Sequence, residues 1–148
     1  MFSTFLLLIH ILGLTMAVGV GAAKVLLLLK CRRDLSLLPA YFQLVKPMTG
    51  MLIAGFIMVT LSGIGWLVTG YPMTGLMWLK IALVVAVWGV GPYIDNVVEP
   101  VMVKLAPKPG EAPSAEFLAV QSKHFALEVL AEGLFIAIIF IWVVLTRL

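Results

Sequence analysis

Apolar residues along this chain fall into four long runs, separated by three shorter segments that are polar or rich in turn-forming residues. A helix needs about 20 mostly apolar residues to cross roughly 30 Å of hydrocarbon. Each run meets this length, so the pattern predicts four membrane-spanning helices at about residues 2–29, 48–68, 75–98 and 125–145. We therefore predict an all-α integral membrane four-helix bundle with up-down topology, forming one domain over residues 1–148.

The three connecting segments differ in character. "KCRRDLSLLPAYFQLVKP" (30–47) is basic and contains proline, as expected of a short loop or interfacial turn. "TGYPMTG" (69–75) carries no charge and predicts a tight turn at the membrane interface, with Tyr71 as an aromatic belt residue. "EPVMVKLAPKPGEAPSAEFLAVQSK" (99–123) is the only long polar stretch, and "PSAEF" within it predicts the cap of a helix that leads into the last span.

Composition supports the membrane class, because 63% of residues are hydrophobic, 11% are charged and the mean hydropathy is +1.17. The basic residues form no dense run and no aromatic-interleaved platform, which excludes nucleic acid as a partner. Cys31 is the single cysteine, so an internal disulfide and a C-x-x-C motif are also excluded.

Loop charge predicts the orientation, since Lys and Arg are retained on the cytoplasmic side of a membrane. The side opposite the first and third connections carries only Arg147. Both termini are therefore predicted on the non-cytoplasmic side of a multi-pass protein in the cell membrane, which we expect to be a bacterial inner membrane. The basic residues on the predicted cytoplasmic side are Lys30, Arg32, Arg33, Lys46, Lys104, Lys108 and Lys123.

Small residues recur along one face of each of the first two spans. Two interpretations are open: the faces pack as a close antiparallel pair, or they leave a slot for a flat ligand. Under the second interpretation, Gly13 and Ala17 would bind a cofactor. The first face holds His10, Gly13, Ala17, Gly21 and Lys24, and the second holds Met48, Met51, Gly55, Met58, Ser62, Gly65 and Thr69.

Ionisable residues within the spans fall into layers when depth is counted at about 1.5 Å per residue. His10 and Lys80 share a layer in the outer third, and Glu132 stands near the middle. An isolated charge in lipid costs at least about 2.5 kcal/mol, so all of these side chains are expected to face the bundle interior, a watery cavity or each other. The remaining ones gather near the cytoplasmic side: Lys24, Asp95, Glu99, His124 and Glu128.

The inner group also has two interpretations. Lys24 opposite Asp95 or Glu128 would make a self-neutralising bundle end. Alternatively, His124, Glu128 and Glu132 are spaced four residues apart on one helical face and would form a graded proton path, in which Glu132 is the first residue to test.

His10 and Lys80 in the outer layer have competing explanations. Lys80 could extend its ammonium group to the nearby surface beside Trp78, while His10 bonds a backbone carbonyl. Together, however, they pair an imidazole with a cation in an apolar bundle, and imidazole is a preferred ligand of haem iron. Ligation by His10 and His124 of the same subunit is excluded, because the two histidines lie roughly 20 Å apart along the membrane normal. A haem ligated by His10 would then take Lys80, a methionine such as Met73 or Met77, or no residue as its second ligand.

Several segments resemble small four-helix membrane proteins of the HemJ-type protoporphyrinogen oxidase and CopD-like superfamily: "HILGLTMAVGVG", "PMTGMLIAGFIMVTLSGIGWLV", "WLKIALVV" and "HFALEVLAEG". The resemblance covers most of the chain. In the HemJ-type family, a first-span histidine and a third-span lysine serve a haem b, and the matching positions here are His10 and Lys80. Glu128 matches a glutamate of the family's last span.

Three functions follow as hypotheses. The first is a haem b-binding membrane protein of redox chemistry or porphyrin oxidation, with His10 as the metal ligand, Lys80, Glu128 and Glu132 as candidate catalytic residues, and a porphyrin or quinone as small-molecule partner. The second is a non-catalytic accessory or assembly subunit, buried against other membrane subunits or further copies of itself. The third is a copper-handling CopD-like protein, prompted by eight methionines, of which Met48, Met51 and Met58 share a face.

Overall fold

The computed structural model describes residues 2–108 and 110–145, a range that excludes Arg147, and this part of the chain contains helices and no strand. The helices are α1 (Phe2–Arg33), α2 (Leu38–Val68), α3 (Gly75–Tyr93), α4 (Glu99–Leu105) and α5 (Ala115–Leu145). Four segments are long and apolar enough to cross a membrane, namely Ser3–Arg33, Leu35–Val68, Gly75–Leu105 and Ala115–Val143. The predicted all-α class with four apolar helices is confirmed.

The helices extend beyond the predicted spans, and the first connection is much shorter than expected. The chain leaves α1 at Arg33 and turns through Asp34 and one 3-10 turn, Leu35–Leu37. The Asp34 carboxylate accepts hydrogen bonds from the Ser36 N–H at 3.0 Å and the Ser36 hydroxyl at 2.6 Å, and these bonds lower the pKa of this exposed carboxyl.

Residues 38–47, predicted to lie in the first loop, are instead the first turns of α2. Pro39 is tolerated there because the first turn of a helix needs no N–H donor at that position. Leu38, Tyr41 and Val45 follow a helical spacing and are buried in one cluster with Leu28 of α1. Tertiary burial of this face therefore continues the helix outside its most apolar part.

The other two connections carry the predicted turn and cap. Gly70 has φ +90° directly after α2, a conformation that favours glycine, and the Thr74 hydroxyl accepts a hydrogen bond from the Met77 N–H at 3.3 Å. At the start of α5, the Ser114 hydroxyl accepts a hydrogen bond from the Phe117 N–H at 3.1 Å. The cap predicted in "PSAEF" is confirmed, and α5 begins about three turns before the predicted span.

Between α3 and α4 the helix continues through a π-helical turn, Ile94–Val98. Pro92 precedes this turn and has no N–H to donate to the helix. The side-chain amide of Asn96, within the turn, donates a hydrogen bond to the Pro92 carbonyl at 2.8 Å. Single π turns inside helices are frequent at functional sites. Here the turn carries Asp95, whose carboxylate pairs with Lys24 of α1.

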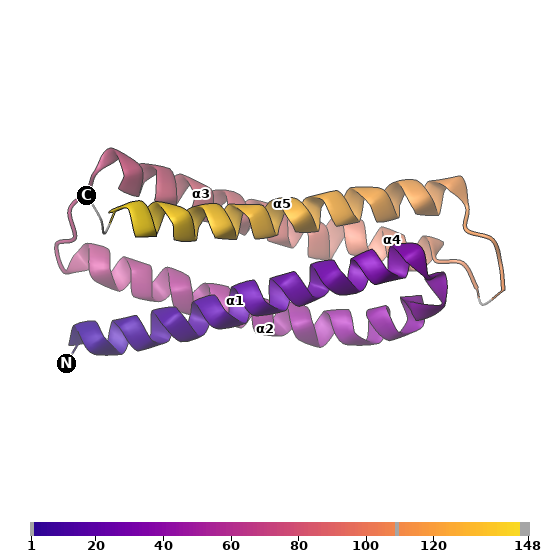
Figure 1. Cartoon of the computed structure of the whole chain (residues 1–148), viewed down its shortest axis with the longest axis horizontal. Helices are drawn as coiled ribbons and strands as arrows, with labels where there is room; N and C mark the ends of the chain where they lie inside the picture. Colours follow the sequence, from indigo (N-terminus) through magenta and orange to yellow (C-terminus); the bar gives the residue numbers. More distant parts are fainter. Residues whose placement is uncertain (1, 109, 146–148) are drawn as a thin grey trace.

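The bundle consists of two closely packed helix pairs (Figure 1). α1 packs along α2, α3 packs on α5, and α1 also contacts α5, whereas α2 and α3 have little contact although they follow each other in the chain. Figure 1 places the α1–α2 and α4–α5 connections at one end, which we call the inner end, and the α2–α3 connection at the opposite, outer end.

The α1–α2 contact is made by the small-residue faces. A Cβ atom on Gly13 would lie 2.7 Å from the Gly55 carbonyl oxygen, and one on Gly55 would lie 2.8 Å from the backbone nitrogen of Ala17. Ala17 is fully buried. The structure thus supports close packing of α1 against α2 at Gly13, Ala17 and Gly55. The role of Gly13 and Ala17 in cofactor binding stays a prediction.

Candidate functional site

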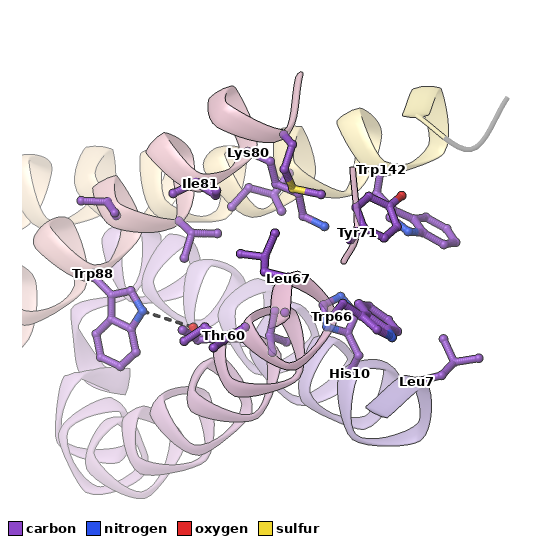
Figure 2. A pocket seen from close by; sticks show the side chains of 17 residues that line it. Leu7, His10, Thr60, Trp66, Leu67, Tyr71, Lys80, Ile81, Trp88 and Trp142 are labelled. Atoms are coloured by element: carbon purple, nitrogen blue, oxygen red, sulfur yellow. Dashed lines mark hydrogen bonds between the residues drawn. The ribbon is translucent and has the colours of Figure 1, made fainter. Parts of the chain in front are cut away.

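A cavity of about 470 Å³ opens at the outer end, in the space where α2 and α3 fail to pack (Figure 2). Volumes of this size are typical of small-molecule and cofactor sites. Its walls are mostly apolar and rich in aromatic residues, and they come from α1, α2, α3, α5 and the α2–α3 turn. The aromatic side chains are Trp66, Tyr71, Trp88 and Trp142.

His10 and Lys80 both line this outer cavity, from opposite walls. Figure 2 shows the Lys80 side chain descending from α3 with its nitrogen toward the cavity, while His10 of α1 lies beside Trp66 on the facing wall. Depth counting had placed the two residues in one layer, and the structure brings them to one cavity. In the described part of the chain, no carboxylate forms an ion pair with Lys80.

The His10 ring is held in place by α2. Its Nδ1 lies 2.9 Å from the Ser62 hydroxyl oxygen, and its ring centroid lies 5.0 Å from that of Trp66. Ser62 is buried and its one hydroxyl proton reaches the Met58 carbonyl at 2.7 Å, so its oxygen is free to accept from His10. This arrangement favours the tautomer with the proton on Nδ1 and a lone pair on Nε2.

The floor of the outer cavity consists of one hydrogen bond between α2 and α3 and a layer of apolar side chains below it. The Trp88 indole donates to the Thr60 hydroxyl at 3.2 Å, bridging α3 and α2. Beneath it, the Phe56 ring packs at a tilt against Trp88 and edge-on against Phe135, with ring centroids 4.7 Å and 5.2 Å apart. We call the buried cluster at this level the apolar layer; it consists of Ala17, Phe56, Val87, Phe135 and Ile138.

The outer cavity also reaches the exposed apolar surface of the bundle. Trp88 and Trp142 line it and are 39% and 43% exposed, and Val85 is exposed as well. The cavity is therefore open to the side of the bundle. Tyr71, predicted as an interface residue, forms part of the same rim.

A second polar site lies at the inner side of the apolar layer, and we call it the inner network. Lys24 Nζ lies 2.9 Å from Glu128 Oε1 and 3.5 Å from Asp95 Oδ1, and it donates to the Thr49 hydroxyl at 3.0 Å. Lys24 and Glu128 are only 3% and 5% exposed. The predicted self-neutralising pairing of Lys24 is confirmed with both carboxylates, since removal of either charge from water requires such partners.

His124 joins the inner network from α5. Its Nε2 lies 3.3 Å from Glu128 Oε1, its Nδ1 lies 3.3 Å from the Met102 sulfur, and the ring is fully buried against Tyr41. Glu132 stands one turn further along α5, where it lines a small cavity of about 30 Å³ with Lys24, Asp95 and Glu128. The predicted line of His124, Glu128 and Glu132 therefore faces the interior.

Sequence reasoning missed the residues that hold these side chains in position. Ser62 stood within the small-residue face of α2, but only the structure shows that it bonds His10. Thr49 and Met102 had no sequence signal at all, since a single threonine or methionine in a span is common. Trp66 and Trp88 line the outer cavity, and their signal in the sequence is their size: they are two of the four tryptophans in the chain.

Metal chemistry at the outer cavity rests on a single imidazole. Across residues 2–108 and 110–145, no group of three or more His, Cys, Asp or Glu side chains is arranged to hold a metal ion. A haem supplies four of its iron's ligands itself and requires one or two from the protein, and His10, Lys80 and Met77 of the cavity wall are side chains of the types that can ligate it. Met73 is not part of the cavity wall.

Comparison of this chain with protein-family models, curated proteins and solved structures finds no significant match.

Proposed function

We propose that this protein binds haem b in the outer cavity and works in membrane redox chemistry or porphyrin oxidation, in line with its resemblance to HemJ-type protoporphyrinogen oxidases. The observation that carries the proposal is the environment of His10. Its Nδ1 is hydrogen-bonded to Ser62, and the ring borders an aromatic, apolar cavity whose wall also includes the ammonium side chain of Lys80. A metal-ligating histidine is usually fixed in this way through its second nitrogen.

His10 would hold the haem iron, and Ser62 fixes the orientation of its ring. Lys80 would either neutralise a propionate group or, in its deprotonated form, serve as a second ligand. Met77, which lines the same cavity, is the alternative second ligand. A bound haem would supply one-electron transfer.

The remaining residues would contact the porphyrin ring and exclude water from the outer cavity. Trp66, Trp88 and Trp142 present flat apolar surfaces that suit a porphyrin ring. The apolar layer below them keeps water of the inner network away from the outer cavity. The lateral opening to lipid suits a porphyrin or quinone as redox partner, since both dissolve in membranes.

The membrane placement is part of the same proposal. Both termini face the non-cytoplasmic side of the cell membrane, a bacterial inner membrane, so the outer cavity lies near the non-cytoplasmic surface. Other membrane subunits, or further copies of the chain, cover part of its apolar surface.

An absorption spectrum of the protein, purified from haem-replete cells, tests the proposal. The wild type is expected to show a Soret band that is lost in His10→Ala. The matched control is His124→Gln, because the chain has two histidines and the second lies in the inner network, on the far side of the apolar layer. His124→Gln should keep the band.

Ser62→Ala keeps His10 and removes its hydrogen bond. The affinity for haem is expected to fall by about 10- to 100-fold, so that less haem is bound. A colourless wild-type preparation, or a Soret band that survives His10→Ala, would contradict the proposal. The colourless result would leave the accessory-subunit hypothesis as the better account.

A further inference from the structure

His124 belongs to the inner network through two contacts of its ring. Its Nδ1 faces the sulfur of Met102, and its Nε2 faces a carboxylate oxygen of Glu128. An ionised carboxylate accepts hydrogen bonds and cannot donate them, so the ring nitrogen that faces an ionised Glu128 is the donor of that bond.

The inner network also contains more acids than bases. Lys24 supplies one positive charge and His124 can supply at most one more, whereas four carboxyl groups surround them from the π turn, α4 and α5. Full ionisation would leave an excess of negative charge inside the bundle, which is strongly unfavourable in a membrane. A carboxyl of this group that has no cation beside it is therefore expected to be neutral. The four are Asp95, Glu99, Glu128 and Glu132.

Glu132 is the carboxyl that no neighbouring cation compensates. Asp95 and Glu128 each pair with Lys24. The Oε2 atoms of Glu99 and Glu132 are both buried without a hydrogen-bond partner, but Glu99 interacts with the charges of Lys24 and His124, whereas the charge that acts on Glu132 is the like charge of Glu128. Glu132 lies against α1 at Gly21, where an added Cβ atom would overlap its Oε2. Glycine at position 21 thus makes the space in which this carboxyl sits.

The small cavity connects Glu132 to the inner network. Its volume of about 30 Å³ suffices for a water molecule, and its wall includes polar groups of Lys24, Asp95, Glu128 and Glu132. On the other side, Val87 and Phe135 close the small cavity and belong to the apolar layer. Among the described residues, the polar side chains around Glu132 thus lie on its inner side, and apolar side chains separate it from the outer cavity.

We propose that Glu132 is a proton-binding site that exchanges its proton with Glu128 through a water molecule in the small cavity, and so with the inner face of the protein. In each exchange the Glu132 carboxyl gives its proton to the water, and the same water gives one of its own protons to the Glu128 carboxylate. Atoms and charge balance without any further reactant. The groups that face this site are Lys24 of α1, Tyr41 and Thr49 of α2, Asp95 of the π turn, Glu99 of α4, and His124 and Glu128 of α5.

Infrared difference spectroscopy of the full chain in lipid nanodiscs, recorded with changing pH, tests this inference. The wild type is expected to show the C=O band of a protonated carboxylic acid, which shifts on transfer to D2O because the proton exchanges. Glu132→Gln should lose the band. Glu116→Gln, which alters an exposed carboxyl at the start of the same helix, should keep it.

A second pair of variants leaves Glu132 in place. Gly21→Ala puts a methyl group where the Glu132 carboxyl lies, so the band should move in frequency, whereas Gly19→Ala on the same helix meets no atom within 4 Å and should leave it unchanged. The inference is overturned if the wild type has no such band, if the band persists in Glu132→Gln, or if it responds to sodium ions at constant pH, which would indicate a cation site. None of these outcomes depends on haem.

Discussion

Lys24 and Lys80 both carry an ammonium group within an apolar helix, and their surroundings differ. Lys24 is enclosed by two carboxylates and a hydroxyl, so its charge is compensated inside the protein. Lys80 faces a large cavity and forms no ion pair within the described ranges. A buried cation with its counter-ions serves the fold, whereas a cation that faces an apolar cavity suits a ligand with negative charge.

Lys24→Met is therefore expected to destabilise the protein strongly. Removing one partner of a buried ion pair leaves the other charge uncompensated and costs about 3–5 kcal/mol. Unfolding by a denaturing detergent in mixed micelles measures the loss.

Lys30→Met provides the control for Lys24→Met, since Lys30 lies exposed on the same helix and its replacement should change stability by less than about 0.5 kcal/mol. If the two variants unfold alike, the buried pair contributes nothing to stability.

At the scale of elements, the close α1–α2 pair determines where the outer cavity forms. Glycines at positions 13 and 55 bring these helices together, and α2 is thereby drawn toward α1 and away from α3. The sequence showed the two small-residue faces, and their packing could be predicted. The position of α3 could not be predicted in the same way, because it depends on which helix α3 packs against. In the structure that helix is α5.

Gly55→Ala should weaken this contact. The new methyl group would lie 2.8 Å from backbone atoms of α1 that cannot move aside, and overpacking of this kind costs about 1–3 kcal/mol. The same detergent unfolding experiment measures the effect.

Gly50→Ala in the same helix is the matched variant, because nothing lies within 4 Å of the added atom. It should be neutral or slightly stabilising, since alanine favours a helix over glycine. Equal destabilisation by both variants would argue against a specific contact at Gly55.

Across the whole molecule, polar and apolar regions alternate along the bundle. The outer cavity contains His10 and Lys80, the apolar layer crosses the middle, and the inner network follows. The apolar layer therefore separates the two polar regions along the bundle. The Lys and Arg residues in the connections are the basis for the orientation in which we propose that the bundle lies across the membrane.

Orientation is tested by single cysteines in a Cys31→Ala background, in which the natural cysteine is absent. Met73→Cys in the α2–α3 turn should react with a membrane-impermeant maleimide in intact cells, whereas Glu111→Cys in the α4–α5 connection should react only after permeabilisation. The opposite pattern would reverse the proposed topology and place the outer cavity on the cytoplasmic side.

The sequence by itself determined the helical class, the four apolar segments, the cap in "PSAEF" and the layer in which the ionisable residues of the spans lie. These properties depend on local composition and on the fixed rise of a helix, so they can be counted along the chain. It also indicated that Lys24 would pair with Asp95 or Glu128, because buried charge demands a partner at the same depth.

Only the tertiary structure decided which faces meet. It closed the face of Gly13 and Ala17 with α2, continued α2 back to Leu38, opened the outer cavity between α2 and α3, and brought Ser62 to His10. Depth along the membrane is a property of each helix alone, but rotation about the helix axis and the choice of neighbour depend on side chains distant in sequence. That is why the layer of His10 and Lys80 could be predicted and the shape of their cavity could not.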